Sequence, residues 1–86
     1  MQIEYILSKS ANIESYNEAF EAVVRHFNGD VSYKKPTIDV DGSVFLTFET
    51  TKGNIEIQAN YYLGVVQAVS SFDADDIFGA ATRLRN

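Results

Sequence analysis

Between Thr37 and Ser71 the chain is rich in apolar and β-branched residues that alternate with polar ones, as in strands that bury one face. Glycine interrupts this stretch at Asp41-Gly42, Lys52-Gly53 and Leu63-Gly64, and the pieces between the breaks have strand length. The pattern predicts an antiparallel meander of about four strands.

The positions of the apolar residues predict how these strands pair. A turn centred on Lys52 and Gly53 brings the apolar rows of its two flanking strands onto one face of the sheet. The expected cross-strand pairs are Val44 with Tyr61, Leu46 with Ala59, and Phe48 with Ile57.

The other two turns follow from the same reasoning. A three-residue loop over 40–42, with Gly42 left-handed in a bulge, pairs Ile38 with Val44 on the core face, whereas a two-residue loop would bury an aspartate. A two-residue loop at Leu63-Gly64 is favoured because it turns a small row inward: Val66, Ala68 and Ser70. The alternative, a three-residue loop, would turn in Val65, Gln67 and Val69.

Two segments have helical periodicity instead. The first has Asn12 as its N-cap and a left-handed stop at Gly29. The second is expected to begin at an Asp73 N-cap and to place Arg83 and Arg85 in its last turn, where the helix dipole favours cations. Its predicted buried stripe is Ala74, Ile77, Ala80, Ala81 and Leu84.

Two shorter segments complete the prediction. Residues 2–7 alternate as a short N-terminal strand, and residues 31–35 resemble an edge strand that is broken at Pro36. The whole chain, residues 1–86, is therefore expected to form a single α+β domain in the order β-α-β-β-β-β-α, with both helices on one face of the sheet.

Composition narrows the class of protein. Of the 86 residues, 45% are hydrophobic and 22% are charged, which is typical of globular domains. The absence of cysteine excludes disulfides, thiolate metal sites and a cysteine nucleophile. The sequence shows no signal-peptide pattern and no stretch of membrane-spanning length, so we expect a cytoplasmic protein without a membrane partner.

Charge bears on the partner. Seven basic and twelve acidic residues give a formal charge of −5, which favours a protein partner with a basic surface and disfavours direct binding of nucleic acid. The helix, strands, helix order superficially resembles a double-stranded RNA-binding domain, which needs basic residues at the start of its final helix. This chain has acids there, Asp73, Asp75 and Asp76, and helix capping and the helix dipole explain them without a metal.

No residue pattern points to catalysis, a metal or a cofactor. His26 is the only histidine and has no recognisable catalytic partner. The segment Asp39-Val40-Asp41-Gly42 partly matches a calcium loop, but the first and last ligand positions would fall on Thr37 and Phe48. We therefore expect a protein that is not an enzyme and has no cofactor.

Two surfaces are candidate partner-binding sites. The sheet face opposite the helices is expected to meet solvent or a partner, and apolar residues lie on it without a structural reason: Phe45, Tyr62, Val65 and Val69. The other candidate is an acidic row on the first helix, Glu14, Glu18 and Glu21, which could mimic nucleic-acid charge toward a basic cleft.

These features favour a non-enzymatic protein–protein interaction module. In its general profile the chain resembles small acidic accessory proteins of phages and mobile elements, including inhibitors of host defence nucleases, which implies an inhibitor or adaptor. Two alternatives stay open. One is a homodimeric structural subunit that pairs through the sheet face, and the other is a small-ligand-binding domain with a pocket near Gln58, Asn60, Tyr61 and Tyr62.

Overall fold

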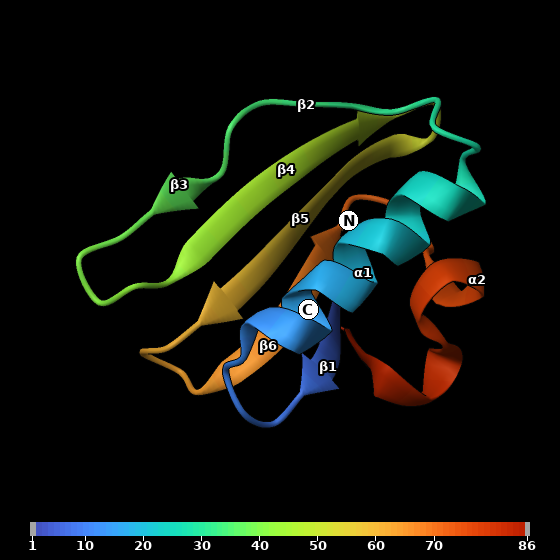
Figure 1. Cartoon of the computed structure of the whole chain (residues 1–86). Coiled ribbons are helices and arrows are strands. Elements are labelled where there is room, and N and C mark those ends of the chain that lie inside the picture. The colour runs from blue at the N-terminus through green and yellow to red at the C-terminus, as the bar shows by residue number, and fades with distance from the viewer. Residues whose placement is uncertain (1, 86) are drawn as a thin grey trace.

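A computed structural model describes residues 2–85, which form one antiparallel sheet with helices packed against it (Figure 1). The spatial order of the strands is β2-β4-β5-β6-β1-β7, and β3 also pairs with β4. The strands are β1 Ile3–Ser8, β2 Ser32–Tyr33, β3 Thr37–Ile38, β4 Val44–Thr50, β5 Gly53–Asn60, β6 Val65–Ser70 and β7 Arg83–Arg85. The helices are α1 Ile13–His26, α2 Asp75–Phe78 and the short 3-10 helix η1 Ala80–Thr82. The predicted α+β fold is confirmed.

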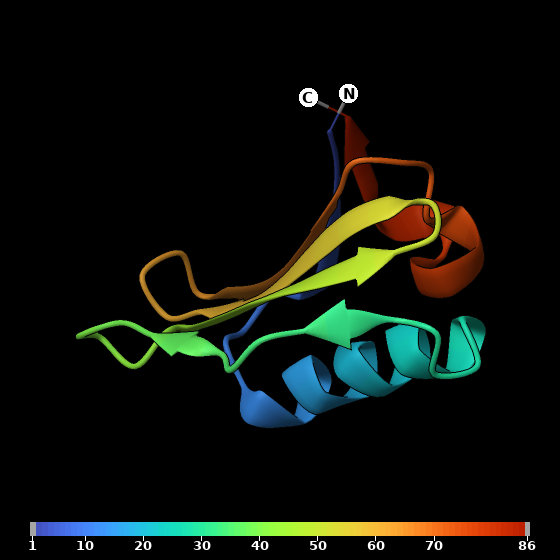
Figure 2. The same cartoon turned by 90° about the horizontal axis from the view of Figure 1, so that it is seen from above.

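Helix α1 begins where its sequence predicts, because the Asn12 side chain accepts a hydrogen bond from the Ser15 N–H at 2.7 Å. The left-handed stop begins one residue earlier than predicted, at Asn28 with φ of 52°, and the N–H of left-handed Gly29 then donates to the Val24 carbonyl at 2.8 Å. Figure 2 shows α1 across one face of the sheet, and none of the described helices covers the opposite face. No helix within residues 2–85 has the length and apolarity needed to cross a membrane.

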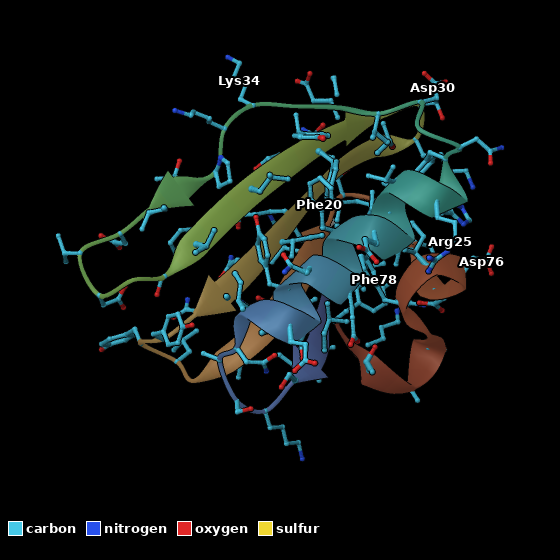
Figure 3. All side chains as sticks on the ribbon, viewed as in Figure 1. Phe20, Arg25, Asp30, Lys34, Asp76 and Phe78 are labelled. Atoms are coloured by element: carbon cyan, nitrogen blue, oxygen red, sulfur yellow. The ribbon has the colours of Figure 1, made fainter. Side chains whose placement is uncertain are left out.

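The core lies between α1 and the inward rows of the sheet. Three aromatic rings close it at the edge, because Phe20 of α1 packs against Tyr33 and Phe48 with ring centroids 5.1 and 5.2 Å away (Figure 3). This contact holds the short strand β2 to the helix. The buried apolar residues of the sheet are Ile3, Tyr5, Leu46, Phe48, Ile55, Ile57, Ala59, Val66 and Ala68.

The register between β4 and β5 differs from the prediction by two residues. The pairs are Val44 with Ala59, Leu46 with Ile57, and Phe48 with Ile55, so the turn consists of Thr51 and Lys52. The Thr50 hydroxyl fixes this turn by accepting from the N–H groups of Lys52 and Gly53 and donating to the Gly53 carbonyl. Gly53 lies in β5 itself, where any Cβ would clash with the Ser71 hydroxyl.

The β5–β6 connection is longer than the predicted two-residue loop. It is a four-residue loop, 61–64, because Asn60 pairs with Val65. A shift of two residues preserves strand parity, so the predicted inward row of Val66, Ala68 and Ser70 is confirmed. Tyr61, predicted to point inward, lies in the loop and is 46% exposed.

The β3–β4 hairpin has the predicted register and a left-handed Gly42 with φ of 89°. Ile38 pairs with Val44 as expected but is 70% exposed rather than buried. Figures 1 and 2 give the reason, since α1 does not extend as far as this hairpin.

The second helix is much shorter than predicted. It ends at Phe78 because Gly79 adopts a φ of 87°, and after η1 the chain continues as β7, which pairs with β1. Arg83 therefore lies in a strand, where its guanidinium contacts the carboxylates of Asp75 at 3.0 Å and Asp73 at 3.4 Å. The predicted stripe residues Ala80, Ala81 and Leu84 are exposed.

Candidate functional site

The structure divides the predicted partner-binding residues between opposite sides of the molecule. Glu14, Glu18 and Glu21 are exposed on α1, which covers one face of the sheet. Phe45, Val65 and Val69 lie on the other face and are half-buried. No single flat partner surface can contact both groups.

A polar network occupies the middle of the uncovered sheet face. Gln58 and Gln67 are cross-strand partners, and the Gln67 amide donates to the Gln58 side-chain carbonyl at 3.0 Å. The Gln58 amide in turn donates to Glu56 at 2.6 Å, and Asn60 donates to Gln58 at 3.3 Å. Both glutamines are at most 9% exposed, so these hydrogen bonds satisfy amides that lie largely out of water.

This network interrupts the apolar group predicted on the face. Phe45 is the cross-strand partner of Gln58, and Val65 and Val69 flank Gln67 along β6. Tyr62, the fourth member, is 87% exposed but belongs to the β5–β6 loop. The four residues therefore surround or lie beyond a polar centre and do not form one apolar surface.

Exposed apolar side chains gather at one end of the sheet. The β3–β4 and β5–β6 loops both lie at the end farthest from α2 (Figures 1 and 2). Four large apolar side chains of these loops, and Ile38 at the end of β3, are each at least 46% exposed. The five residues are Ile38, Val40, Tyr61, Tyr62 and Leu63. We call these five residues the loop-end patch.

Ser43 joins the two loops. Its buried hydroxyl accepts a hydrogen bond from the Tyr61 N–H at 2.9 Å. Its own N–H donates to the Asp41 carboxylate at 2.9 Å, and its carbonyl accepts from the Asp39 N–H at 2.8 Å. The Tyr61 ring lies against Gly42, where an added Cβ would be 3.9 Å from it. The two loops are thus held together by hydrogen bonds and packing.

Asn60 fixes the second loop internally. Its side-chain oxygen accepts from the Leu63 N–H at 2.9 Å, and its backbone carbonyl accepts from the Gly64 N–H at 2.8 Å. Because both loops are closed by their own hydrogen bonds, the loop-end patch needs little ordering when it meets a partner.

The charged residues within the two segments that carry the loop-end patch are both acidic. Residues 37–43 and 61–64 contain Asp39 and Asp41 and no lysine or arginine. Hydrogen bonds from Ser43 hold the pKa of Asp41 below its usual value, so this carboxylate is ionised at neutral pH. The Asp39 carboxylate accepts from the Val40 N–H at 2.8 Å. The patch therefore combines an apolar centre with anchored anions.

Sequence reasoning named only Tyr62 of this patch as a partner-binding residue, and it named Tyr61 only for the alternative small-ligand pocket. It placed Ile38 and Tyr61 in the core, and it treated Val40 and Leu63 as turn residues without a role. The available signal was the presence of large apolar residues inside two turns, where glycine, asparagine, aspartate and serine usually predominate.

Tyr5 has the most clearly perturbed titration, but its surroundings are structural. Its hydroxyl donates to Asp75 and accepts from the Ala74 N–H, both at 2.8 Å. Burial, together with the hydrogen bond to Asp75, raises the pKa of Tyr5 to about 12. The phenol therefore stays protonated at neutral pH, and its hydroxyl serves to hold the Ala74 backbone and the Asp75 side chain in place. Within residues 2–85, His, Asp and Glu side chains form no group of three or more that could hold a metal ion.

No family model matches the chain, and neither a curated protein nor a solved structure matches it.

Proposed function

We propose that this protein is a non-enzymatic interaction module that docks on a larger protein through the loop-end patch. The observation that carries the proposal is the gathering of five exposed large apolar side chains on two loops that Ser43 holds together. Contiguous exposed apolar surface commonly marks an interface. Tyrosine, present here twice, is among the residues that most often dominate binding energy.

The charges around the patch indicate the kind of partner. Asp39 and Asp41 adjoin the apolar centre, and the whole chain carries a formal charge of −5. A partner with an apolar recess and a basic rim would complement both features. An inhibitor or adaptor of the phage or mobile-element type, such as an inhibitor of a host defence nuclease, fits this description because nucleases present basic surfaces to nucleic acid.

The same charges disfavour self-association through this patch. In a two-fold dimer each patch would face a copy of itself, so the interface would bring together the carboxylates of Asp39 and Asp41 from both copies without a lysine or arginine from these segments. Sedimentation at micromolar concentration tests this point, and the protein is expected to remain a monomer.

The loop-end patch can be tested by substitutions that keep the fold. A double variant, Tyr62→Ser with Leu63→Ser, is expected to lose a partner that the wild-type protein captures, because both side chains are more than half exposed and contribute little to the core. Ile13→Ser is the matched control, since Ile13 is 53% exposed on α1. Circular dichroism should show an unchanged fold in both proteins.

Retention of the same partner by the double variant would refute docking through this patch. Loss of the partner on Phe45→Ala alone, with the double variant still binding, would assign the interaction to the uncovered sheet face. A partner that the double variant releases should also bind more weakly to Asp39→Asn at low salt, since the lost charge reduces electrostatic attraction.

A further inference from the structure

The sheet edge beside β4 contains a gap between β2 and β3. Strand β2 pairs with Phe48 and Glu49, and β3 pairs with Val44 and Phe45, whereas Leu46 and Thr47 have no partner from either strand. Three residues, 34–36, lie opposite Leu46 and Thr47, and Pro36 has no N–H that could donate a hydrogen bond to β4. The edge segment therefore bows away from β4.

The backbone of Thr47 faces this gap. Along an antiparallel strand the N–H and C=O groups of alternate residues point to opposite neighbours. The Ser43 carbonyl accepts from Asp39 on the edge side, so Thr47, four residues further along, also directs its peptide groups to the edge side. Its strand partner on the other side is Glu56, and the edge side offers none.

A cavity of about 450 Å³ lies at this gap. Its volume falls within the range of small-ligand sites, roughly 300–1,000 Å³. The apolar part of its lining consists of Tyr33, Phe45 and Leu46, and Thr47 is part of the wall. Leu46 is buried and the Tyr33 ring packs against Phe48, so Phe45 provides the main apolar contact next to the unpaired backbone groups.

Charges of both signs line the same cavity without neutralising one another. Lys34 and Lys35 lie on the bowed segment, and Glu49 and Glu56 lie on the sheet. Among the described residues no ion pair within 4.0 Å joins these lysines to these glutamates. Figure 3 shows the Lys34 side chain extending from the edge into solvent. Glu56 is oriented by the hydrogen bond from Gln58.

We propose that this cavity binds a short peptide with free amino and carboxyl ends, of about dipeptide size. The N–H and C=O of Thr47 match the carboxylate and the amide N–H of the C-terminal residue of a dipeptide, because an antiparallel pair joins two residues through both groups of each. Glu49 and Glu56 would receive the ammonium group, and the exposed side chains of Lys34 and Lys35 the carboxylate. Because β2 and β3 close the gap at both ends, a longer strand cannot pass through it. This site is separate from the loop-end patch, and the inference does not depend on the proposed function.

The test is a titration of the ¹⁵N-labelled protein with the dipeptide Ala-Phe, followed by the backbone amide resonances. The Thr47 and Leu46 resonances are expected to shift, with a Kd on the order of 1 mM for such an open site. N-acetyl-Ala-Phe lacks the cation and Ala-Phe-amide lacks the anion. Each blocked peptide should bind about tenfold more weakly, since each loses one charge-assisted contact.

Variants of the protein complete the test. Glu49→Gln should weaken binding of Ala-Phe but leave the affinity for N-acetyl-Ala-Phe unchanged. Lys35→Gln should weaken binding of Ala-Phe but leave the affinity for Ala-Phe-amide unchanged. Lys52→Gln, in the exposed β4–β5 turn, is the control and should bind like the wild type. No shift at Thr47 with about 10 mM Ala-Phe, or equal affinity for the free and blocked peptides, would overturn the proposal.

Discussion

Tyr5 illustrates how one buried polar group positions a segment distant in sequence. Its hydroxyl accepts a hydrogen bond from the Ala74 N–H and donates to Asp75, and Asp75 also forms an ion pair with Arg83. Its ring lies 5.3 Å from that of Phe78, which reaches in from α2. These contacts hold a helix of only four residues, which could not form in isolation.

Replacing Tyr5 with Phe should therefore destabilise the protein. The substitution keeps the ring but leaves the buried Ala74 N–H without its acceptor, so the free energy of unfolding is expected to fall by about 1–3 kcal/mol. Urea denaturation measures this change. Tyr33→Phe is the matched control, because Tyr33 is 50% exposed, and its unfolding curve should overlay the wild type.

Tyr5 also predicts a dependence of stability on alkaline pH. Its pKa is about 12 in the folded protein, against 10.0 for an unperturbed tyrosine. Above pH 10 the unfolded chain loses this proton while the folded chain keeps it, so stability falls as pH rises from about 10 to 12. The Tyr5→Phe variant should show a smaller loss over this interval in parallel denaturation curves, and an equal loss would contradict the assignment.

At the scale of elements, strand parity was predictable and strand register was not. Alternation correctly assigned the inward rows of β4, β5 and β6, because burial of one face depends only on odd or even position. Register depends on turn chemistry, and the Thr50 hydroxyl moved the β4–β5 turn by one residue, which shifted the cross-strand pairs by two. Glycine was taken as the turn residue, whereas Gly53 serves close packing within a strand.

The C-terminal segment escaped prediction for a different reason. Residues 73–85 have helical spacing of apolar residues, but tertiary contacts overrode it. Gly79 breaks the helix, and the unpaired edge of β1 offers hydrogen bonds that β7 takes. A strand of three residues has too short a pattern to be found by periodicity. The loop-end patch also depends on tertiary structure, because its residues lie on two loops that only the folded sheet brings together. Periodicity within either loop could not predict it.

The packing role of Gly53 can be measured. Gly53→Ala should lower the free energy of unfolding by about 2–3 kcal/mol, because the new Cβ would clash with the Ser71 hydroxyl. Gly64→Ala is the control, because Gly64 also has a positive φ but an added Cβ there would have no atom within 4 Å. Its cost should be limited to backbone strain of roughly 1 kcal/mol. Similar losses in the two variants would show that conformation, not packing, constrains Gly53.

At the scale of the whole molecule, the surfaces with candidate roles occupy different parts of the sheet and of α1. The acidic row of α1 is on one face, the glutamine network is on the other, the loop-end patch is at one end, and the cavity is at the β2–β3 edge. The acidic row and the loop-end patch share no residue with the other surfaces, so substitutions there are expected to act independently. The glutamine network and the cavity share Glu56, so a substitution of Glu56 affects both.

The loop-end patch should contribute to binding and not to folding. Tyr62→Ala is expected to change the free energy of unfolding by less than about 0.5 kcal/mol, because the side chain is 87% exposed. Thermal denaturation followed by circular dichroism checks this value. A loss above that range would indicate that the loop side chains support the sheet, and would remove the reason for assigning them to a partner.

The placement of β1 between β6 and β7 has a consequence for the time course of folding. Ile3 pairs with Ser70 on one side and with Arg85 on the other, so the first strand acquires its neighbours from the last third of the chain. Contacts between such distant residues form slowly, because a long loop must close before any of them is gained. The meander of β4, β5 and β6 can assemble first, and the arrival of β1 then becomes the late event that commits the whole protein to its native state.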